Sequence, residues 1–445
     1  MRAQEVIDIQ QAGVNALHAD DPELARLLDA ELREQIGTLA IVAHASLAHP
    51  SVLAAAGSVL SNVTAEGYPG RRYHPGAEHF DEVERLAIAR AKAAFGAAYA
   101  NVQPHSCSTA NQVVLFNLLT PGDTILGLQL DAGGHLSHGS AESVTGRAFR
   151  GVHYGVDATG RIDYDEVARL ARLHRPKLIV AGASAYPRLL DYPRFRAIAD
   201  EVGAWLLADI SHIAGLVAAG VVPSPIDIAH VTTTSTYKQL GGPRGGLILM
   251  GRDAETPVPD GTPLSTVLNR GVFPRVQGTP NAAAIAAKAR AFDLMLRPAF
   301  AETARRIAAD ARALASILIR QGHRVLTGGT DNHMVLVDVA AGGLSGVVAE
   351  RALRECGILA NRNRIVGDTR PPLVSSGLRF GTNIPAQRGM GPDDMTDCAD
   401  LIDHVLRAVE PQSDTRYRLD PGIRDKTREG VARLCRAFPV PGYQE

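Results

Sequence analysis

Hydrophobic positions recur along the chain with two different periods. Residues 22–36 (PELARLLDAELREQI) and 81–95 (DEVERLAIARAKAAF) place Leu, Ile and Ala at helical spacing, and acidic residues open the second segment. This spacing predicts two amphipathic helices. The stretch between them is rich in Gly, Pro, Tyr and His and follows neither period.

Short, uninterrupted apolar runs alternate with helical segments between about residues 100 and 250. The runs are DTILGLQL, KLIVAGAS, AWLLADIS and GGLILMG. Unbroken apolar strands that alternate with helices indicate a parallel sheet covered on both faces. Because ligands of such sheets bind at the carboxyl ends of the strands, we expect the active site there.

The pattern changes after about residue 290. A long helix rich in Ala and Arg (AETARRIAADARALASILIRQ) precedes a strand (HMVLVDVA) and further helices, which is typical of a smaller α+β domain. A chain of 445 residues also exceeds what one hydrophobic core usually supports. We therefore expect an N-terminal helical arm (1–35), a large α/β domain (36–290) and a small C-terminal domain (291–445).

Charge and cysteine usage narrow the classes of function. The 46 basic and 47 acidic residues give a net charge of -1, which disfavours nucleic acid or an anionic membrane as a partner. The four cysteines are scattered, without the spacing of a metal site or a disulfide framework. No window reaches the roughly 18 apolar residues of a membrane span, and the N-terminus has no signal-peptide core. These features predict a soluble protein of a reducing cytoplasm.

Lys238 stands in the segment TTTSTYKQLGGPRGG, residues 232–246. A lone lysine is usually a solvated surface residue. Here Thr232 to Thr236 on one side and Gly241 and Gly242 on the other leave room for a carbonyl cofactor, which a Schiff-base lysine must approach closely. The segment therefore makes Lys238 a candidate for covalent catalysis.

Three other segments carry candidate cofactor contacts. Asp209 ends the apolar run AWLLADI and is either a helix cap or the negative partner of a pyridinium nitrogen. In QPHSCSTAN, Ser106 and its neighbours open a helix, where they either cap it or bind a phosphate. In DAGGHLSHGS, His135 follows two glycines and is either a structural turn residue or a stacking partner for a planar ring.

Seven segments in the same order resemble the serine hydroxymethyltransferase family of pyridoxal-phosphate enzymes. They are AEGYPGRRY, YANVQPHS, GGHLSHG, DISHIAGLVAAG, GPRGGLIL, GGTDNH and SGLRFGT, and the similarity runs from about residue 30 to about 410. The resemblance implies an α/β fold of type I: a large domain with a mostly parallel seven-stranded sheet between helices, and a small C-terminal α+β domain. It also implies pyridoxal 5'-phosphate as the cofactor, an amino acid substrate, tetrahydrofolate as a second substrate, and a homodimer with shared active sites.

The resemblance assigns the cofactor contacts residue by residue. Lys238 would carry the cofactor, Asp209 would pair with its pyridinium nitrogen, and His135 would stack on its ring. The other cofactor-binding positions are Ser106, Cys107 and Ser108 at the phosphate, Ser184 and His212 at the ring hydroxyl, Tyr237 beside the lysine, and Gly278 at the phosphate of a neighbouring subunit.

The substrate contacts follow in the same way. Arg379 would clamp the substrate carboxylate, for which its planar fork is suited. Glu66 and Tyr73 match the acid/base glutamate and the active-site tyrosine of the family, and Asn363 falls where the family contacts folate.

The sequence also departs from the family around the substrate. The serine-glutamate-asparagine signature near the N-terminus is replaced by AHAS. The individual changes are His44 and Ala45 in that signature, Thr64 and His74 in place of tyrosines, Tyr237 in place of histidine, and Cys107 in place of glycine. Since the positions that hold the cofactor are kept, the pattern indicates the same cofactor with an altered substrate or reaction.

Two reactions fit this pattern. The first is hydroxymethyl transfer or aldol cleavage on serine or an α-methylserine-like substrate, for which Thr64 leaves room. In this reaction Glu66 would act as the acid or base for the proton of the substrate's β-hydroxyl. The second is folate-independent β-elimination, or decarboxylation or deamination, of a larger amino acid such as a cysteine S-conjugate, as in lincosamide-pathway relatives. There a base such as Lys238 would take the α-proton. A non-catalytic binding protein on this scaffold would be expected to lose Lys238 or Asp209.

Overall fold

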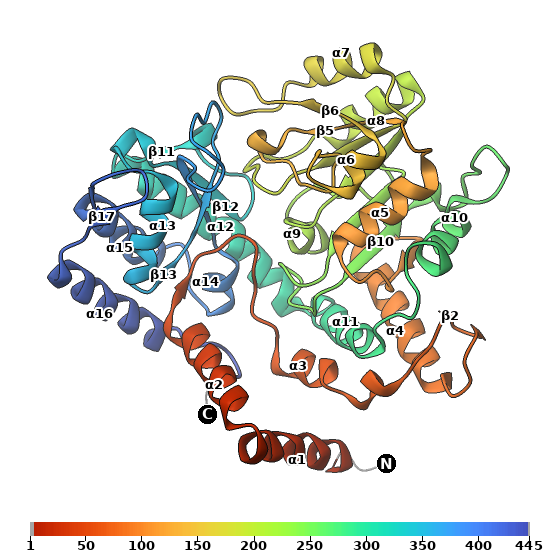
Figure 1. The fold of residues 1–445 in the computed structure, drawn as a ribbon, viewed down its shortest axis with the longest axis horizontal. Coiled ribbons are helices and arrows are strands. Elements are labelled where there is room, and N and C mark those ends of the chain that lie inside the picture. Colours follow the sequence, from red (N-terminus) through yellow and green to blue (C-terminus); the bar gives the residue numbers. More distant parts are fainter. Residues whose placement is uncertain (1–3, 444–445) are drawn as a thin grey trace.

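The computed structural model describes residues 4–443 and consists of two lobes and an N-terminal arm (Figure 1). The arm is formed by α1 (Gln4–Asp20), which projects away from both lobes, and α2 (Pro22–Gly37), which lies beside the smaller lobe, where Glu34 Oε1 is 2.6 Å from Arg354 Nη1. None of the residues of α1 is buried, although this helix carries Val6, Ile7, Ile9 and Val14. None of the helices in residues 4–443 combines the length and the apolar character needed to cross a membrane.

The larger lobe is built on a seven-stranded sheet. Its strand order is β4 (Tyr99–Asn101), β10 (Gly246–Met250), β9 (Val231–Ser235), β8 (Trp205–Asp209), β7 (Leu178–Gly182), β5 (Thr124–Leu128) and β6 (Arg150–Tyr154). The five strands from β9 to β6 are parallel, whereas β10 is antiparallel to both β9 and β4. The predicted mostly parallel sheet is confirmed. The reversal at β10 follows from its connection, because a turn without a helix can join only antiparallel neighbours.

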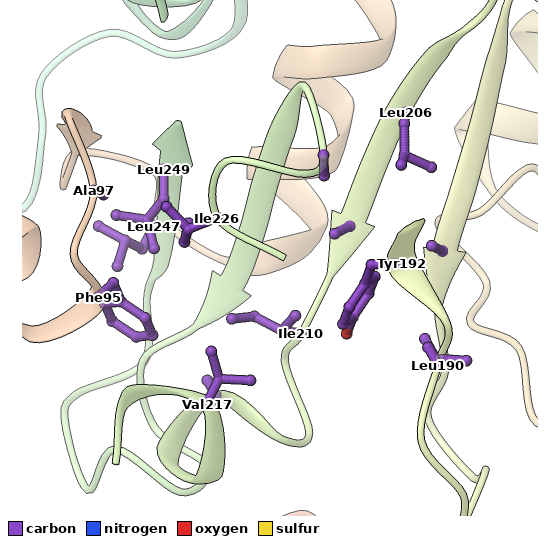
Figure 2. Packing of buried hydrophobic residues seen from close by; sticks show 14 of the residues in the cluster. Phe95, Ala97, Leu190, Tyr192, Leu206, Ile210, Val217, Ile226, Leu247 and Leu249 are labelled. Carbon is purple, nitrogen blue, oxygen red and sulfur yellow. The ribbon is translucent and has the colours of Figure 1, made fainter. Parts of the chain in front are cut away.

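Helices cover both faces of this sheet. Within β8, Leu206 and Ala208 pack into one hydrophobic core and Leu207 into the other, as the alternation of side chains along a strand requires. Figure 2 shows the first core, where Leu247 and Leu249 of β10 lie with Phe95 at the end of α4. The helices around the sheet are α3 (Pro50–Ala56), α4 (Glu78–Phe95), α5 (Cys107–Leu118), α6 (Val144–Ala148), α7 (Tyr164–His174), α8 (Tyr192–Val202), α9 (Ala214–Ala218), α10 (Leu264–Arg270) and α11 (Ala282–Met295).

The smaller lobe is an antiparallel sheet with helices. The sheet has the order β11 (Arg324–Val325), β12 (Met334–Asp338), β15 (Gly377–Gly381) and β14 (Asn361–Asn363). Its helices are α12 (Pro298–Arg320), α13 (Gly346–Glu355), α14 (Asn383–Gln387), α15 (Met395–Ala408) and α16 (Pro421–Ala437). Three two-stranded pairs complete the fold: β1 (Leu39–Ala40) with β13 (Ile358–Leu359), β2 (Gly67–Tyr68) with β3 (Arg71–Arg72), and β16 (Glu410–Pro411) with β17 (Tyr417–Arg418).

The packing divides the chain differently from the expected domain boundaries. Leu39 and Ile41 belong to the core of the smaller lobe, because β1 pairs with β13. At the other boundary, the change of core falls inside α12, where Ala308 packs in the larger lobe and Ala311 in the smaller. A single long helix, α12, therefore contributes to the cores of both lobes. The two cores meet near residue 310 and not at the expected boundary of 290.

Candidate active site

Nine of the expected cofactor positions line one cavity at the carboxyl ends of the parallel strands. Asp209 is the last residue of β8, Lys238 follows β9, Ser184 follows β7 and His135 follows β5. The nine, which together define the Lys238 cavity, are Ser106, Cys107, Ser108, His135, Ser184, Asp209, His212, Tyr237 and Lys238. Strand ends of a parallel sheet meet at one edge, so the topology brings these distant segments together.

Lys238 is buried, with 7% of its surface exposed, so its interpretation as a solvated residue is wrong. Burial lowers the pKa of Lys238, and the charge of Asp209 opposes that effect. A lowered pKa favours the neutral, nucleophilic amine that attack on an aldehyde requires. The side chain preceding it, Tyr237, lies 4.0 Å beneath the guanidinium of Arg244.

Asp209 is held by hydrogen bonds in the interior and does not cap a helix. Its Oδ2 accepts from Asn111 Nδ2 at 2.8 Å and from His138 Nε2 at 3.0 Å, while its Oδ1 accepts from the amide and the hydroxyl of Ser211 at 3.0 and 2.6 Å. The helix that follows, α9, has Ile213 at its N-cap. The cap interpretation is therefore wrong, and the arrangement preserves an anion inside the protein.

The start of α5 forms another wall of the Lys238 cavity. Ser106 Oγ accepts from the amide of Thr109 at 3.0 Å, so the serine-cap interpretation is confirmed for this hydroxyl. The amides of Cys107 and Ser108 are in the first turn, where a helix supplies no partner of its own. The Cys107 thiol instead turns toward Asp209, with Sγ 3.6 Å from Oδ1.

Two histidines of the cavity are neutral at ordinary pH. Burial and the charge of His138 lower the pKa of His135 to about 4, and His135 Nδ1 lies 2.8 Å from Ser137 Oγ. Burial and then the charge of Lys238 lower the pKa of His212 well below its ordinary value. Within the described residues, His212 Nδ1 has no hydrogen-bond partner, and its ring stacks on that of His333 at 6.0 Å.

Arg379 reaches this region from β15 of the smaller lobe. It is 8% exposed, and its Nη1 donates to the Ser184 carbonyl at 2.6 Å. Its Nη2 donates to Asn361 Oδ1 at 3.2 Å and lies 3.4 Å from His44 Nδ1. Desolvation, then the charges of Arg379 and Lys238, lowers the pKa of His44 to about 4. A neutral imidazole thus stands beside the guanidinium.

The segment that carries His44 is packed tightly against β15. A Cβ at Gly381 would lie 2.3 Å from the Cα of Ala43, so only glycine fits there. The side-chain Nδ2 of Asn383 donates to the backbone carbonyls of Ala43 and Ala45 at 3.3 and 3.2 Å. Backbone contacts therefore place His44 next to Arg379.

The other five expected positions lie elsewhere in the described protomer and form what we call the hairpin cluster: Thr64, Glu66, Tyr73, His74 and Gly278. None of them lines the Lys238 cavity. His74 Nε2 lies 3.7 Å from Glu66 Oε2, and a Cβ at Gly278 would lie 3.3 Å from Glu66 Oε1. Tyr73 is 74% exposed and its ring lies 5.5 Å from that of Phe273. Figure 1 shows β2 far from α9, on the opposite side of α11.

Several residues of the site were missed from the sequence. Asn111, His138 and Ser211 all hold Asp209, and Asn361 holds Arg379. Only two had a local signal: His138 is the second histidine of HLSH, and Ser211 stands two positions after the aspartate. Asn363, the expected folate contact, lies on β14 with its side chain donating to the Arg364 carbonyl at 2.6 Å.

The described residues fit pyridoxal phosphate. A buried anion suits a pyridinium nitrogen, a buried lysine of lowered pKa suits the aldehyde, and open amides with hydroxyls at a helix start suit a phosphate. All three features belong to the Lys238 cavity. The chemistry of this donor set matches the three functional groups of the cofactor.

Comparison with known proteins agrees with this fit. The family model described as serine hydroxymethyltransferase matches residues 17–402. A serine hydroxymethyltransferase of Synechococcus sp. (strain JA-3-3Ab) is 49% identical over 433 residues, covering 94% of this chain and 96% of the relative. One from Alkalilimnicola ehrlichii (strain ATCC BAA-1101 / DSM 17681 / MLHE-1) is 48% identical over 426 residues, covering 96% and 97%.

Proposed function

Because this chain belongs to the serine hydroxymethyltransferase family of pyridoxal-phosphate-dependent transferases, we propose that it transfers the hydroxymethyl group of a serine-type amino acid to tetrahydrofolate. The observation that carries the proposal is the convergence of Lys238, Asp209 and Arg379 on one region from three separate segments. Pyridoxal phosphate, when bound, supplies an electron sink for the bond that breaks at Cα.

The residues of the Lys238 cavity would prepare the site for this chemistry. Asp209, kept anionic by its hydrogen bonds, would hold a proton on the ring nitrogen of the cofactor. Lys238, whose lowered pKa favours the neutral amine, would hold the cofactor covalently through its aldehyde group. Neutral His135 would pack against the ring without competing for the charge of Asp209.

Arg379 would bind the substrate carboxylate. Its Nη1 and Nη2 are occupied by the Ser184 carbonyl and Asn361 Oδ1, which fix the guanidinium plane. His44 Nδ1, at 3.4 Å from Nη2, is the weakest of these contacts and is the one that a carboxylate would replace. Such a carboxylate would form charge-assisted hydrogen bonds that a water molecule does not match.

We infer a homodimer in which each hairpin cluster completes the Lys238 cavity of the other subunit. Glu66 and Tyr73 would act on the substrate, yet in one protomer they lie outside the cavity and Tyr73 is 74% exposed. The arm supports the same inference, because α1 and α2 expose an apolar set that a partner subunit would cover: Val6, Ile7, Ile9, Val14, Leu24, Leu27, Leu28 and Leu32.

For the substrate itself, we propose an α-methylserine-like amino acid alongside serine. Thr64 is smaller than the tyrosine of the family, so the partner's hairpin cluster would leave free volume beside the Cα atom of the substrate, where an α-methyl group would fit. His44 belongs to the segment AHAS, which replaces the family's serine-glutamate-asparagine signature, and its place beside Arg379 supports a changed carboxylate site. The same change supports the alternative, a folate-independent elimination, decarboxylation or deamination of a larger amino acid such as a cysteine S-conjugate.

One assay separates these reactions. The purified protein with pyridoxal phosphate is incubated with L-serine, α-methylserine or an S-alkylcysteine, each with and without tetrahydrofolate, and the products are identified by mass spectrometry. Hydroxymethyl transfer predicts glycine or alanine that forms faster with tetrahydrofolate. Release of a thiol, carbon dioxide or ammonia without folate would contradict the proposal and favour the alternative.

A mixed dimer tests the shared site. Lys238→Ala and Glu66→Gln each remove one half of the site, so each homodimer should be inactive. A heterodimer that carries one variant in each subunit retains one intact site if the halves come from different chains, and activity should return on mixing. Glu66→Gln mixed with itself is the control. Failure of the mixed dimer to recover activity would place both residues in one protomer's site.

A further inference from the structure

Lys288 is a buried lysine outside the Lys238 cavity. It lies on α11 and is 2% exposed. Its ammonium donates to three backbone carbonyls: Val102 at 2.6 Å, Pro104 at 3.1 Å and Gly246 at 2.9 Å. Since a lysine ammonium has three N–H donors, the side chain is fully used in these contacts.

The three carbonyls belong to two segments that meet behind the start of α5. Residues 102–106 connect β4 to α5, and Gly246 opens β10, where its amide donates to the Pro104 carbonyl at 2.8 Å. The fit is tight. A Cβ at Gly245 would lie 2.4 Å from Cε of Lys288, and one at Gly246 would lie 2.2 Å from the Ser106 carbonyl oxygen. The glycine pair of GPRGG therefore lets both Lys288 and the 102–106 loop approach β10.

Removing the ammonium would leave these carbonyls facing one another. Each is buried, and an unsatisfied buried carbonyl is destabilising. Gly246 would retain its amide contact to Pro104, but the Val102 carbonyl would have to find a new partner by moving. Movement of residues 102–106 would displace the amides at the start of α5, which lie directly after this loop.

We propose that Lys288 is a positioning residue for the phosphate-binding loop of the cofactor site. By holding the Val102 and Pro104 carbonyls against β10, it fixes the first amides of α5 where the cofactor phosphate binds. This inference rests on the proposed assignment of Ser106 to Ser108 to the phosphate. Lys288 is not one of the described residues that line the cavity, so it acts through the loop.

Comparing pyridoxal phosphate with pyridoxal isolates the phosphate contribution. The dissociation constant of each is measured by titration of the cofactor-free full chain, for the wild type and for Lys288→Met. We expect the preference of the wild type for the phosphorylated form to fall by about tenfold or more in Lys288→Met, with the affinity for pyridoxal changed less than about threefold. Lys288→Gln, which keeps two N–H donors, should be intermediate, and it decides the question if Lys288→Met does not fold.

Arg388 provides a matched control. It is 4% exposed and donates to the carbonyls of Ile36, Thr38, Cys435 and Phe438, far from the loop in the sequence. Arg388→Met should lower the thermal-unfolding midpoint without changing the preference for the phosphate. If the Lys288 variants lose affinity for pyridoxal phosphate and pyridoxal equally, or keep the preference of the wild type for the phosphate, the proposal for Lys288 is wrong. The assignment of the phosphate site would still stand. A wild type without preference for the phosphate would overturn the assignment of Ser106 to Ser108 as well.

Discussion

His138 Nε2 lies 3.0 Å from Asp209 Oδ2 in the interior of the larger lobe. Burial by itself would raise the pKa of Asp209. The hydrogen bond and charge of His138, together with the hydrogen bond from Ser211, outweigh burial and hold that pKa far below its ordinary value. Asp209 therefore remains an anion away from solvent, which is the condition for pairing with a pyridinium nitrogen.

Replacing His138 should destabilise the ionised form of the Asp209 carboxylate. His138→Leu removes one donor from Oδ2, so we expect the free energy of unfolding to fall by about 1.5–3 kcal/mol and the affinity for pyridoxal phosphate to fall with it. Urea unfolding and cofactor titration measure both. In a double-mutant cycle with Asp209→Asn the effects should be non-additive. Strict additivity would show that the two side chains do not act together.

Lys238 should carry the cofactor covalently. Borohydride reduction of the loaded protein, followed by peptide mass spectrometry, should add the cofactor to the peptide containing Lys238. Lys238→Ala should lose that label and about 10³-fold or more of the activity. Lys288 serves as an internal control, because it is also buried but its ammonium donates to three carbonyls. A label on any other lysine would refute the assignment.

Buried histidines should make the protein sensitive to acid. Burial, then the charge of Arg196, lowers the pKa of His230 to about 4 from an ordinary 6.5. Between these pH values the unfolded chain binds a proton that the folded chain does not, so stability falls as the pH falls through that window. His230→Asn keeps an acceptor for the Leu206 amide, which His230 Nδ1 accepts at 2.9 Å, and does not titrate.

The His230→Asn variant should therefore lose about 1–3 kcal/mol less than the wild type between pH 6.5 and pH 4. Urea unfolding at several pH values measures the difference. Parallel curves for the two proteins would show that His230 does not contribute to the acid sensitivity.

The apolar side of the arm should be required for dimerisation. Leu27 and Leu28 on α2 are 51% and 52% exposed in one protomer. The double variant Leu27→Glu with Leu28→Glu should shift the sedimentation equilibrium toward monomer and reduce activity, since the hairpin cluster of the partner would be lost. Gln35→Glu, on the same helix, is the control. A fully active monomer would contradict the shared site.

Cys107 should contribute less to the binding of pyridoxal phosphate than its position in the Lys238 cavity implies. Burial, then the charge of Asp209, raises the pKa of its thiol well above the ordinary value, so it stays protonated and is a weak donor at 3.6 Å. Cys107→Gly should change the affinity for pyridoxal phosphate by less than about threefold. Ser211→Ala removes the 2.6 Å hydrogen bond to Asp209 and should lower the affinity for pyridoxal phosphate about tenfold. A larger loss of affinity in Cys107→Gly than in Ser211→Ala would show that the thiol contributes more to cofactor binding than the hydroxyl does.

Sequence reasoning identified the elements better than their contacts. The apolar runs predicted β5, β7, β8 and β10, and the helical spacing predicted α2, α4 and α12. The donors to Asp209 were missed because Asn111 and His138 precede it by 98 and 71 residues. Nothing in the local pattern links positions so far apart. The antiparallel direction of β10 was missed for a similar reason, since an apolar run has no direction until its neighbours are known.

The sequence by itself determined the fold class, the family and the cofactor, because these depend on hydrophobic periods and short motifs that are fixed along the chain. Only the tertiary structure decided which candidate residues share a site. It placed Lys238, Asp209 and seven others around one cavity, and Glu66, Tyr73 and Gly278 outside it. The physical reason is that a site forms where strand ends, a helix start and a second lobe pack together, and that packing is a property of the whole chain.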